Sequence, residues 1–494
     1  MSYRSRLSSS LPLALFALGS MSVVAGSAGA EEDRLKITPQ VEVSQAYDSE
    51  EVIVGDGERS GRIFEVRPGL KVDAKLGGLS FTATAGARSR SNSADNDLDS
   101  TDENGQFEMR YRLTPRFTAT ASASFRDRKN FDPRDSDSDS FDGDRAMDAV
   151  TGRPDRKDAG GAVGFQYMLN PKLTLTGNLS TFARDFDGLS GNRDFDVNGG
   201  ELALQQVVTP RDLLVLRAGY RTIEFDAPDT AGRNGAQIFE RRTSATDQIG
   251  TVTAGWQRQL APMWSANLNA GLRLLKSRND GFLGLSGPSF GSGTIDTRDT
   301  GFEGGISLTR RSEMAQTTLS FRQDTRPSSG LGTTVDSQIF RFLHRQRLTR
   351  SLTLRLVASY QKDESSIGQL FATNPISMFE LIQRGFPPFV AAGFPNGICP
   401  VGRFGNPMDR LDGNLSCVGV ASSDVEDELF AAGISLDYEI RPQLVTFLTV
   451  NYRSQKRDGA SAIQDTAEET VFGRDRDSTR AMIGVRFGYD IDLF

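Results

Sequence analysis

Hydrophobic and polar residues alternate one by one along many stretches of the chain. The clearest stretch runs from Phe117 to Arg126, where Phe and Ala occupy every second position and Thr, Ser and Arg occupy the positions between. The same alternation returns at 173–176, 264–273 and 352–356. Because successive side chains of a strand point to opposite faces, this period of two predicts strands with one apolar and one polar face.

Short segments of similar composition precede the predicted strands. Most of them contain proline, which presets φ for a tight turn and cannot donate to a strand ladder. These segments are therefore predicted to be hairpin corners. They are Leu113-Thr114-Pro115-Arg116, Leu169-Asn170-Pro171-Lys172, Val208-Thr209-Pro210-Arg211, Leu260-Ala261-Pro262-Met263, Leu348-Thr349-Arg350-Ser351 and Ile440-Arg441-Pro442-Gln443.

Long polar connections alternate with the short corners. Further corners at Gly77-Gly78 and at 310–313 bring the short connections to eight, and with nine long ones they join eighteen strands. The long connections are predicted at 50–60, 91–104, 128–158, 185–196, 224–246, 277–297, 326–334, 363–424 and 456–476. The predicted fold is all-β, an antiparallel transmembrane β-barrel of about eighteen strands (16 to 18) with short periplasmic turns and long extracellular loops.

The first thirty residues have the features of a secretory signal peptide. Two arginines precede an apolar run at 11–18, and the small residues Ala28-Gly29-Ala30 end the segment. The apolar run is too short to cross a bilayer, which needs roughly twenty residues. We therefore expect residues 1–30 to be a signal peptide and residues 31–494 to form one barrel domain in the bacterial outer membrane.

The end of the chain carries a second sign of this class. Apolar residues alternate with polar residues or glycine towards the final Phe494. Here the chain resembles bacterial outer-membrane proteins, whose last strand carries a Gly-x-x-aromatic-x-aromatic assembly signal that Gly484, Phe487 and Tyr489 match. Met482 departs from that signal, because a polar residue is typical there. The resemblance implies insertion by the barrel assembly machinery into a membrane of lipid and lipopolysaccharide.

The repeated strands, the Leu-Thr-Pro corners and the Arg-rich polar face also resemble the beta-barrel porin 2 family, whose members are often linked to exopolysaccharide systems. The resemblance covers most of the chain after the signal peptide and rests on the repeated pattern. It implies a porin-like channel with a link to polysaccharide export.

Contact with lipid determines the outer face of a barrel, so the alternate residues point into the lumen. With Leu113, Leu169, Leu348 and Ile440 on the lipid side, the inward set holds sixteen basic and seven acidic residues. The predicted pore-lining residues are Arg67, Arg88, Arg110, Arg112, Arg126, Arg217, Arg221, Arg273 and Arg355. Uncompensated positive charge favours anions, so the hypothesis is passage of small anionic or saccharide solutes. The alternative is that these charges only pair and solvate the interior.

Acidic residues are concentrated in the predicted loops of a chain whose formal net charge is -7. This acidic balance argues against a nucleic-acid partner. An EF-hand in the 128–158 loop would need Gly and Glu where the sequence has Ser140 and Ala146, so no metal site is predicted. A solvated loop is the expectation, with weak divalent-cation binding as the alternative.

The 363–424 connection is partly apolar and holds both cysteines of the chain. In an exported protein, a disulfide between Cys399 and Cys417 is expected. Asn374-Pro375 is suited to begin a short helix ending before Gly385. The loop then either folds into the barrel as a constriction or plug, or forms a surface cap.

Residues suited to catalysis are few. The one histidine, His344, is predicted on the lipid side near the short-turn end, away from any nucleophile. No P-loop, dinucleotide fingerprint or metal-ligand spacing occurs, so no cofactor is expected. Because strand alternation begins near Leu35, no N-terminal plug of an energised transporter is expected. The prediction is a passive channel, with a closed structural barrel acting through its extracellular loops as the alternative and an enzyme as the least favoured reading.

Overall fold

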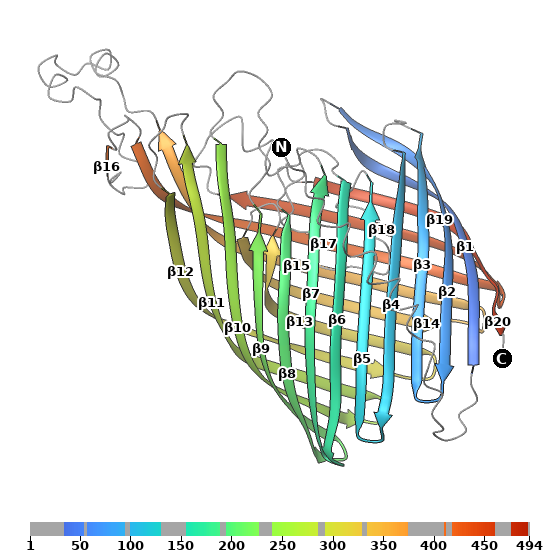
Figure 1. The fold of residues 1–494 in the computed structure, drawn as a ribbon. Helices are drawn as coiled ribbons and strands as arrows, with labels where there is room; N and C mark the ends of the chain where they lie inside the picture. The colour runs from blue at the N-terminus through green and yellow to red at the C-terminus, as the bar shows by residue number, and fades with distance from the viewer. Residues whose placement is uncertain are drawn as a thin grey trace, which may run out of the picture.

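In the computed structural model, the alternating segments form long antiparallel strands (Figure 1). The structure describes residues 34–53, 57–93, 99–129, 155–187, 194–226, 240–284, 292–328, 333–373, 410–411, 417–459 and 476–492. The strands are β1 (Arg34–Ile53), β2 (Gly57–Leu76), β3 (Leu79–Asn92), β4 (Ser100–Thr114), β5 (Phe117–Arg128), β6 (Asp155–Asn170), β7 (Leu173–Asp187), β8 (Phe195–Thr209), β9 (Asp212–Phe225), β10 (Glu240–Ala261), β11 (Trp264–Gly284), β12 (Ser292–Arg311), β13 (Ala315–Ser328), β14 (Thr333–Arg347), β15 (Leu352–Thr373), β16 (Arg410–Leu411), β17 (Cys417–Arg441), β18 (Leu444–Gly459), β19 (Arg476–Gly488) and β20 (Ile491–Asp492). Within these ranges, no helix is both long enough and apolar enough to cross a bilayer.

Each long strand pairs with its neighbours in the chain, and the last long strand returns to the first. β19 pairs with β1 from Gln40↔Gly488 to Asp48↔Arg480, which closes the sheet into a barrel. β15 pairs directly with β17, while β16 and β20 have two residues each. The described residues therefore form a closed wall of eighteen long antiparallel strands, as the sequence predicts.

The short connections gather at one end of the barrel, at the bottom of Figure 1. At the corner between β4 and β5, the Thr114 hydroxyl accepts hydrogen bonds from the backbone N–H groups of Arg116 (3.3 Å) and Phe117 (3.0 Å). Thr349 has the same role at the corner before β15. Gly77 has a φ of 54°, which favours glycine at the β2–β3 corner. We call this end the turn side and the opposite end the loop side.

Several strands extend further towards the loop side than the sequence predicts. β15 continues to Thr373, β17 begins at Cys417 and β6 begins at Asp155. The predicted loops 128–158 and 363–424 are therefore wrong at their borders. Their other residues, including the helix expected at 374–384, lie outside the described residues.

The strand extensions carry charged side chains. Lys362 Nζ, for example, lies 2.8 Å from a carboxylate oxygen of Glu364 and 2.7 Å from one of Glu426. Beyond the lipid a strand needs no apolar face, so the period-two signal is lost although the hydrogen-bond ladder continues. Hydrophobic alternation therefore identifies the membrane-crossing part of each strand and misses the rest.

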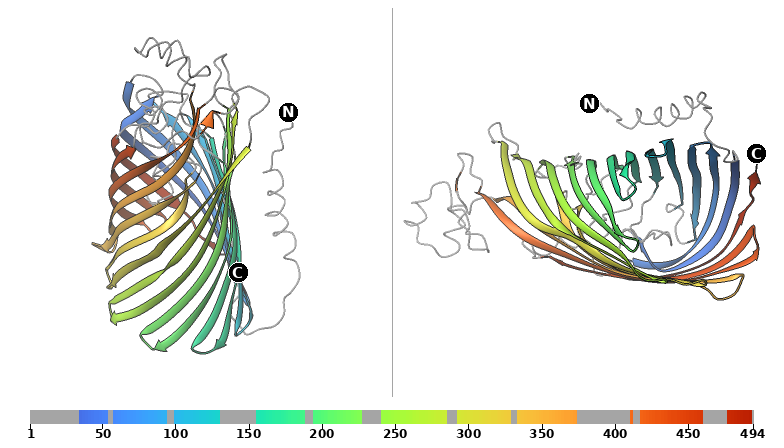
Figure 2. Two further views of the ribbon diagram at one scale, coloured as in Figure 1. Left: turned by 90° about the vertical axis from the view of Figure 1, so that its left-hand side faces the viewer. Right: turned by 90° about the horizontal axis from the view of Figure 1, so that it is seen from below.

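The outer surface of the barrel is apolar. Leu113, Leu169, Leu348 and Ile440, the residues expected on the lipid side, are all exposed. Exposed leucine, valine, isoleucine and phenylalanine side chains occur on strands all round the wall. Seen from below, the barrel has an oval outline (Figure 2). A closed barrel with an apolar exterior is the arrangement that lipid on the outside requires.

Candidate functional site

The nine arginines predicted to line a pore lie on the inner face of the wall. Outward-facing apolar residues flank them in the sequence, as the exposed Leu216 and Leu272 precede Arg217 and Arg273. Arg110 and Arg112 share the face of chamber-lining residues on β4 and β5. The nine differ in their surroundings, which divide the lumen into a turn-side half and a loop-side half.

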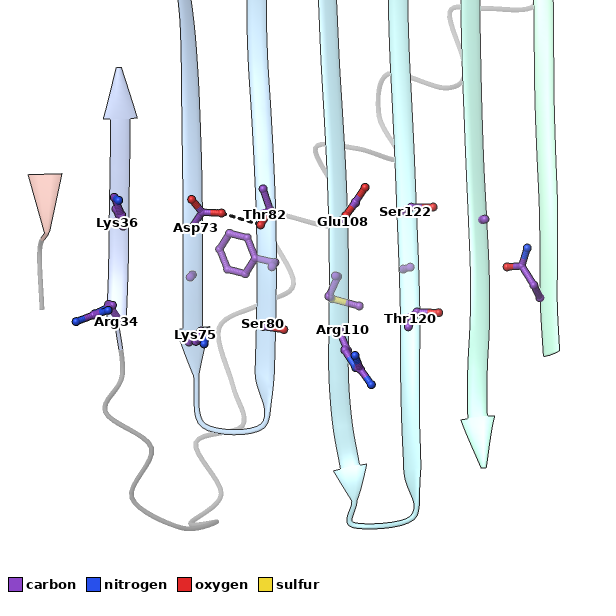
Figure 3. A pocket seen from close by; sticks show the side chains of 16 residues that line it. Arg34, Lys36, Asp73, Lys75, Ser80, Thr82, Glu108, Arg110, Thr120 and Ser122 are labelled. Carbon is purple, nitrogen blue, oxygen red and sulfur yellow. Dashed lines mark hydrogen bonds between the residues drawn. The ribbon is translucent and has the colours of Figure 1, made fainter. Parts of the chain in front are cut away.

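A chamber of about 720 Å³ lies in the turn-side lumen, against β1 to β7 (Figure 3). Hydroxyl groups and an amide form part of its lining, together with four basic and two acidic side chains. The charged residues are Arg34, Lys36, Lys75, Arg110, Asp73 and Glu108, and the other polar ones are Ser80, Thr82, Thr120, Ser122 and Asn178. The chamber therefore offers hydrogen-bonding groups and an excess of positive charge.

Most cations of the chamber have no carboxylate partner among the described residues. Lys36 lies 2.8 Å from Asp490, an exposed ion pair at the rim. Within the described part of the chain, Arg34, Lys75 and Arg110 make no ion pair. Their charge can therefore act on whatever occupies the chamber.

Two more of the predicted arginines lie on the same inner face, Arg112 nearer the short turns and Arg126 nearer the loop side, opposite Asp158 of β6. Arg112 and Arg126 are exposed on the inner faces of β4 and β5, and neither has an ion-pair partner among the described residues. The nearby Asp73 carboxylate is engaged by Lys71 and by the Thr82 hydroxyl, both at 2.8 Å. The turn-side half is thus wet and positively charged.

On the loop side, much of the inner wall is buried and several of its charges form ion pairs. Glu65 is fully buried, and its carboxylate lies 2.6 Å from Arg88, 2.7 Å from Arg480, 2.8 Å from Arg67 and 3.6 Å from Arg90. These residues belong to β2, β3 and β19, so one carboxylate joins strands from both ends of the chain. A buried charge cluster of this kind requires each member, because removal of one leaves the others uncompensated.

A second buried group joins β6, β7 and β8. Asp158 lies 2.7 Å from Arg156 and 2.8 Å from Arg184. The Arg184 guanidinium also lies over the rings of Phe182 and Phe195, at 5.5 and 5.2 Å from their centroids. Burial here is stabilised by ion pairs and aromatic contact together.

The inner wall holds more acids than the sequence analysis predicts. Apart from Glu42, the missed acids lie at or near the borders of predicted loops, where polar strand was read as loop. They are Glu42, Asp102, Asp158, Asp247, Asp299, Asp363 and Asp427. The basic surplus of the inner wall is therefore smaller than the sequence predicts.

The wall is interrupted between β12 and β13. Their pairing stops at Gly304↔Gln323, and the pairing of β14 with β15 stops at Asp336↔Glu364. The end of the β13–β14 hairpin is thus paired with neither β12 nor β15. We call its described residues, 324–328 and 333–335, the hairpin tip.

The hairpin tip lies across the lumen. Arg221 of β9 donates a hydrogen bond to the backbone carbonyl of Thr325 (2.6 Å), and the backbone N–H of Thr334 donates to Asp247 of β10 (3.0 Å). Each contact joins strands four places apart, which would lie roughly 19 Å apart along the wall. Figure 1 shows the arrowhead of β13 beside β9 and away from the upper part of β12. The tip therefore covers the inner face of β9–β11.

An apolar cluster lies on that covered face. Ile223, Phe225 and Ile249 are buried almost completely, with Phe195 and Ala245 beside them. They occupy inward positions, where sequence reasoning expects polar side chains. Inward apolar residues near the loop ends of strands are the signal that could have predicted a filled loop-side lumen.

The structure also places residues of the predicted assembly signal and disulfide. Phe487 of β19 pairs with β1, and the side chains of Phe487 and Tyr489 are exposed, while Gly484 lies opposite Ser44. Phe494 and Cys399 lie outside the described residues, so the disulfide to Cys417 stays a prediction.

His344 lies on the outer face, as expected. Its Nδ1 is 2.9 Å from the Thr317 hydroxyl and its ring stacks on Phe342. Within the described ranges, no group of three or more His, Cys, Asp or Glu residues is arranged to hold a metal ion.

Comparison with known proteins gives structural matches only. No family model matches the chain, and no curated protein matches it. The matching structures include the alcaligin outer-membrane receptor of Bordetella pertussis (9% identity, 94% of this chain and 77% of that chain, TM-score 0.40). They also include a siderophore receptor of Acinetobacter baumannii, with 11% identity over 94% of this chain and 82% of that chain and a TM-score of 0.43. A third is the ferric yersiniabactin uptake receptor of Yersinia pestis, with 11% identity over 92% of this chain and 80% of that chain and a TM-score of 0.43. At these identities and TM-scores, the similarity carries no inference about function.

The architecture itself defines the class of protein. The closed eighteen-stranded wall, the apolar exterior and the short turns at one end are those of a bacterial outer-membrane β-barrel. The chain therefore resides in the outer membrane, with the turn side towards the periplasm.

Proposed function

We propose that the protein is an outer-membrane channel for small anionic solutes, acidic saccharides included. The observation that carries this proposal is the turn-side chamber, where Arg34, Lys75 and Arg110 make no ion pair among the described residues. A low-dielectric wall focuses the field of such charges into the lumen and raises the local concentration of anions. Hydroxyl groups such as those of Ser80 and Thr120 offer hydrogen bonds that suit a saccharide.

A second candidate is a closed barrel with a structural or surface-interaction role. The hairpin tip favours this candidate, because it lies across the loop-side lumen against β9 and β10. Glu65, Arg88 and Arg90 are also buried in that half. Conductance separates the two candidates, since a closed barrel passes no current.

The test is ion selectivity in planar bilayers under a salt gradient. We expect the purified protein to conduct with a reversal potential on the anion side. Replacing Arg110, Arg112 and Arg126 together by Glu should move that potential towards cations, because the charge facing the lumen is reversed.

The matched control changes the same number of charges outside the wall. Arg116, Arg211 and Arg350 are exposed in short corners, and their replacement by Glu should leave most of the selectivity unchanged. Absence of conductance in all variants would favour the closed barrel. Equal shifts in the two triple variants would show that the inner-face arginines do not determine selectivity.

A further inference from the structure

We infer that the hairpin tip is the gate of the channel, with the closed position seen here and a second position outside the lumen. This inference rests on the proposed channel function and assigns its regulation. The closed position is defined by contacts that reach the tip from three strands, β9, β10 and β11.

The first contacts engage the edge of β13. Arg221 donates to the Thr325 carbonyl at 2.6 Å, and Arg273 of β11 contacts the hydroxyl of the same residue. Thr325 is 1% exposed, although it lies on the strand edge that β12 has left unpaired. Arginine side chains thus satisfy an edge that a neighbouring strand would otherwise pair.

Arg273 makes several of the contacts that hold the tip in the closed position. Its guanidinium contacts Asp336 of β14 and lies 2.7 Å from Asp299 of β12, so it holds the tip to the wall that the tip has left. Gly301 leaves space for this reach, because a Cβ there would lie within 2.3 Å of the Arg273 guanidinium. The third contact is the hydrogen bond from the Thr334 N–H to Asp247.

The sequence of the tip prevents complete pairing with the neighbouring strand β12. Above Gly304, β12 pairs only with β11 among the described residues, and continuation of its register would set Phe302 opposite Thr325 and Thr300 opposite Pro327. In a strand, the N–H and C=O of one residue point to the same side, and residues two apart point alike. Because the Thr325 carbonyl faces away from β14, towards the side of β12, the nitrogen of Pro327 faces that side as well. Proline has no N–H to donate there, so the ladder cannot be completed in full.

Two properties follow from this construction. The tip is held to the wall by a few polar contacts with side chains and by the buried Val335, while the rest of the hairpin is held by ladders with β12 and β15. Loss of the polar contacts therefore frees the tip and leaves the wall intact. A free tip uncovers the inner face of β9–β11 and opens the loop-side lumen to the chamber below.

The test measures the position of the tip and the conductance separately. In a background with both native cysteines replaced by Ser, Thr325→Cys reports accessibility through its rate of reaction with a water-soluble maleimide. Adding Arg221→Gln and Arg273→Gln should raise this rate by about tenfold or more, the ratio expected when a hydrogen bond to a charged group is lost. The same release substitutions, without the reporter cysteine, should raise the open probability in bilayers.

A tether gives the opposite prediction. Asp247→Cys with Thr334→Cys, oxidised to a disulfide, should abolish conductance, and reduction should restore it. The matched control, Thr118→Cys with Gln166→Cys, joins neighbouring inner-face positions of β5 and β6 without crossing the lumen, and its oxidation should leave conductance unchanged.

The outcomes distinguish the two proposals. An unchanged labelling rate in the release variant would overturn the gate, whether or not the protein conducts. Conductance that persists in the oxidised tether would overturn the gate and leave the channel in place. Absence of current in every variant, release variant included, would overturn the channel and the gate with it.

Discussion

On the turn side of the lumen, Arg110 is exposed and makes no ion pair among the described residues, whereas on the loop side Arg88 is 8% exposed and lies 2.6 Å from Glu65. Both arginines occupy inward positions on neighbouring strands of the same wall. The difference between them is solvent. Water in the chamber stabilises an unpaired guanidinium, while a buried guanidinium requires a partner.

This comparison separates the two readings of the arginine-rich wall. Arginines that pair with buried carboxylates join strands, and loss of either partner would destabilise the barrel. Arginines that face the chamber without a partner contribute little to stability and leave their charge available to a solute. The same residue type on the same face therefore has two roles, and its exposure to solvent decides which.

The largest effect is expected from breaking the buried cluster. Glu65→Gln removes the one carboxylate that Arg88, Arg480 and Arg67 share, and should destabilise the folded barrel by about 3–5 kcal/mol, as loss of a buried partner does. Urea unfolding of the protein folded into lipid vesicles measures the change.

The same substitution in the turn-side half is its control. Glu108 is exposed and accepts a hydrogen bond from Gln106, so Glu108→Gln should change the unfolding free energy by less than about 0.5 kcal/mol. Similar losses in both variants would mean that the two halves do not differ in solvation.

Hydrophobic alternation predicts the inner face correctly, because lipid requires an apolar residue at every second position wherever a strand crosses the membrane. It also predicts the corners, since Pro115 and its counterparts carry the turn chemistry. It does not predict the partners of the arginines. Asp102 and Asp158 lie on strand extensions without an apolar face, so they read as loop acids although they are buried in the inner wall beside Arg88, Arg156 and Arg184.

The next effect concerns the loop-side rim, where Asp194 is half-buried and forms no ion pair within the part of the chain that the structure describes. Asp194 precedes β8 and accepts a hydrogen bond from the Phe186 N–H (2.7 Å). Burial, with Asp185 and Asp226 nearby, raises the pKa of the Asp194 carboxyl to about 6. The folded state thus binds this proton more tightly than the unfolded state, so the stability it contributes is present below about pH 4 and lost as pH rises through 6.

Asp194→Asn keeps the hydrogen-bond acceptor and removes the titration. The loss of stability between pH 4 and pH 7 should therefore be smaller in this variant than in the unaltered protein, as measured by urea unfolding at the two pH values. Asp99→Asn is the matched control, because Asp99 also accepts a backbone hydrogen bond, from Asn92 at 2.7 Å. An equal change in both variants would contradict the assignment to Asp194.

The hairpin tip shows where prediction from sequence ends. Thr325 and Asp336 follow the outward alternation of β13 and β14, so sequence reasoning places them towards lipid or solvent. The structure instead turns them towards the inner face of β9–β11, where Arg221 and Arg273 contact them. Contacts between distant segments determine that β13 and β14 separate from their neighbouring strands at this end. In the local sequence, only Pro327 indicates it.

The smallest effect is expected at the turn-side rim. There, an exposed ion pair should contribute almost nothing to the free energy of unfolding. Lys36 and Asp490 lie 2.8 Å apart, and Asp490 also accepts a hydrogen bond from the Thr38 hydroxyl (2.8 Å). Both side chains are well exposed, so water competes for each of them and salt screens their attraction. Asp490→Asn should leave the urea midpoint unchanged within error at low and high salt. A loss comparable to that of Glu65→Gln would show that the turn-side rim is as dry as the loop-side wall, and the division of the lumen would fail.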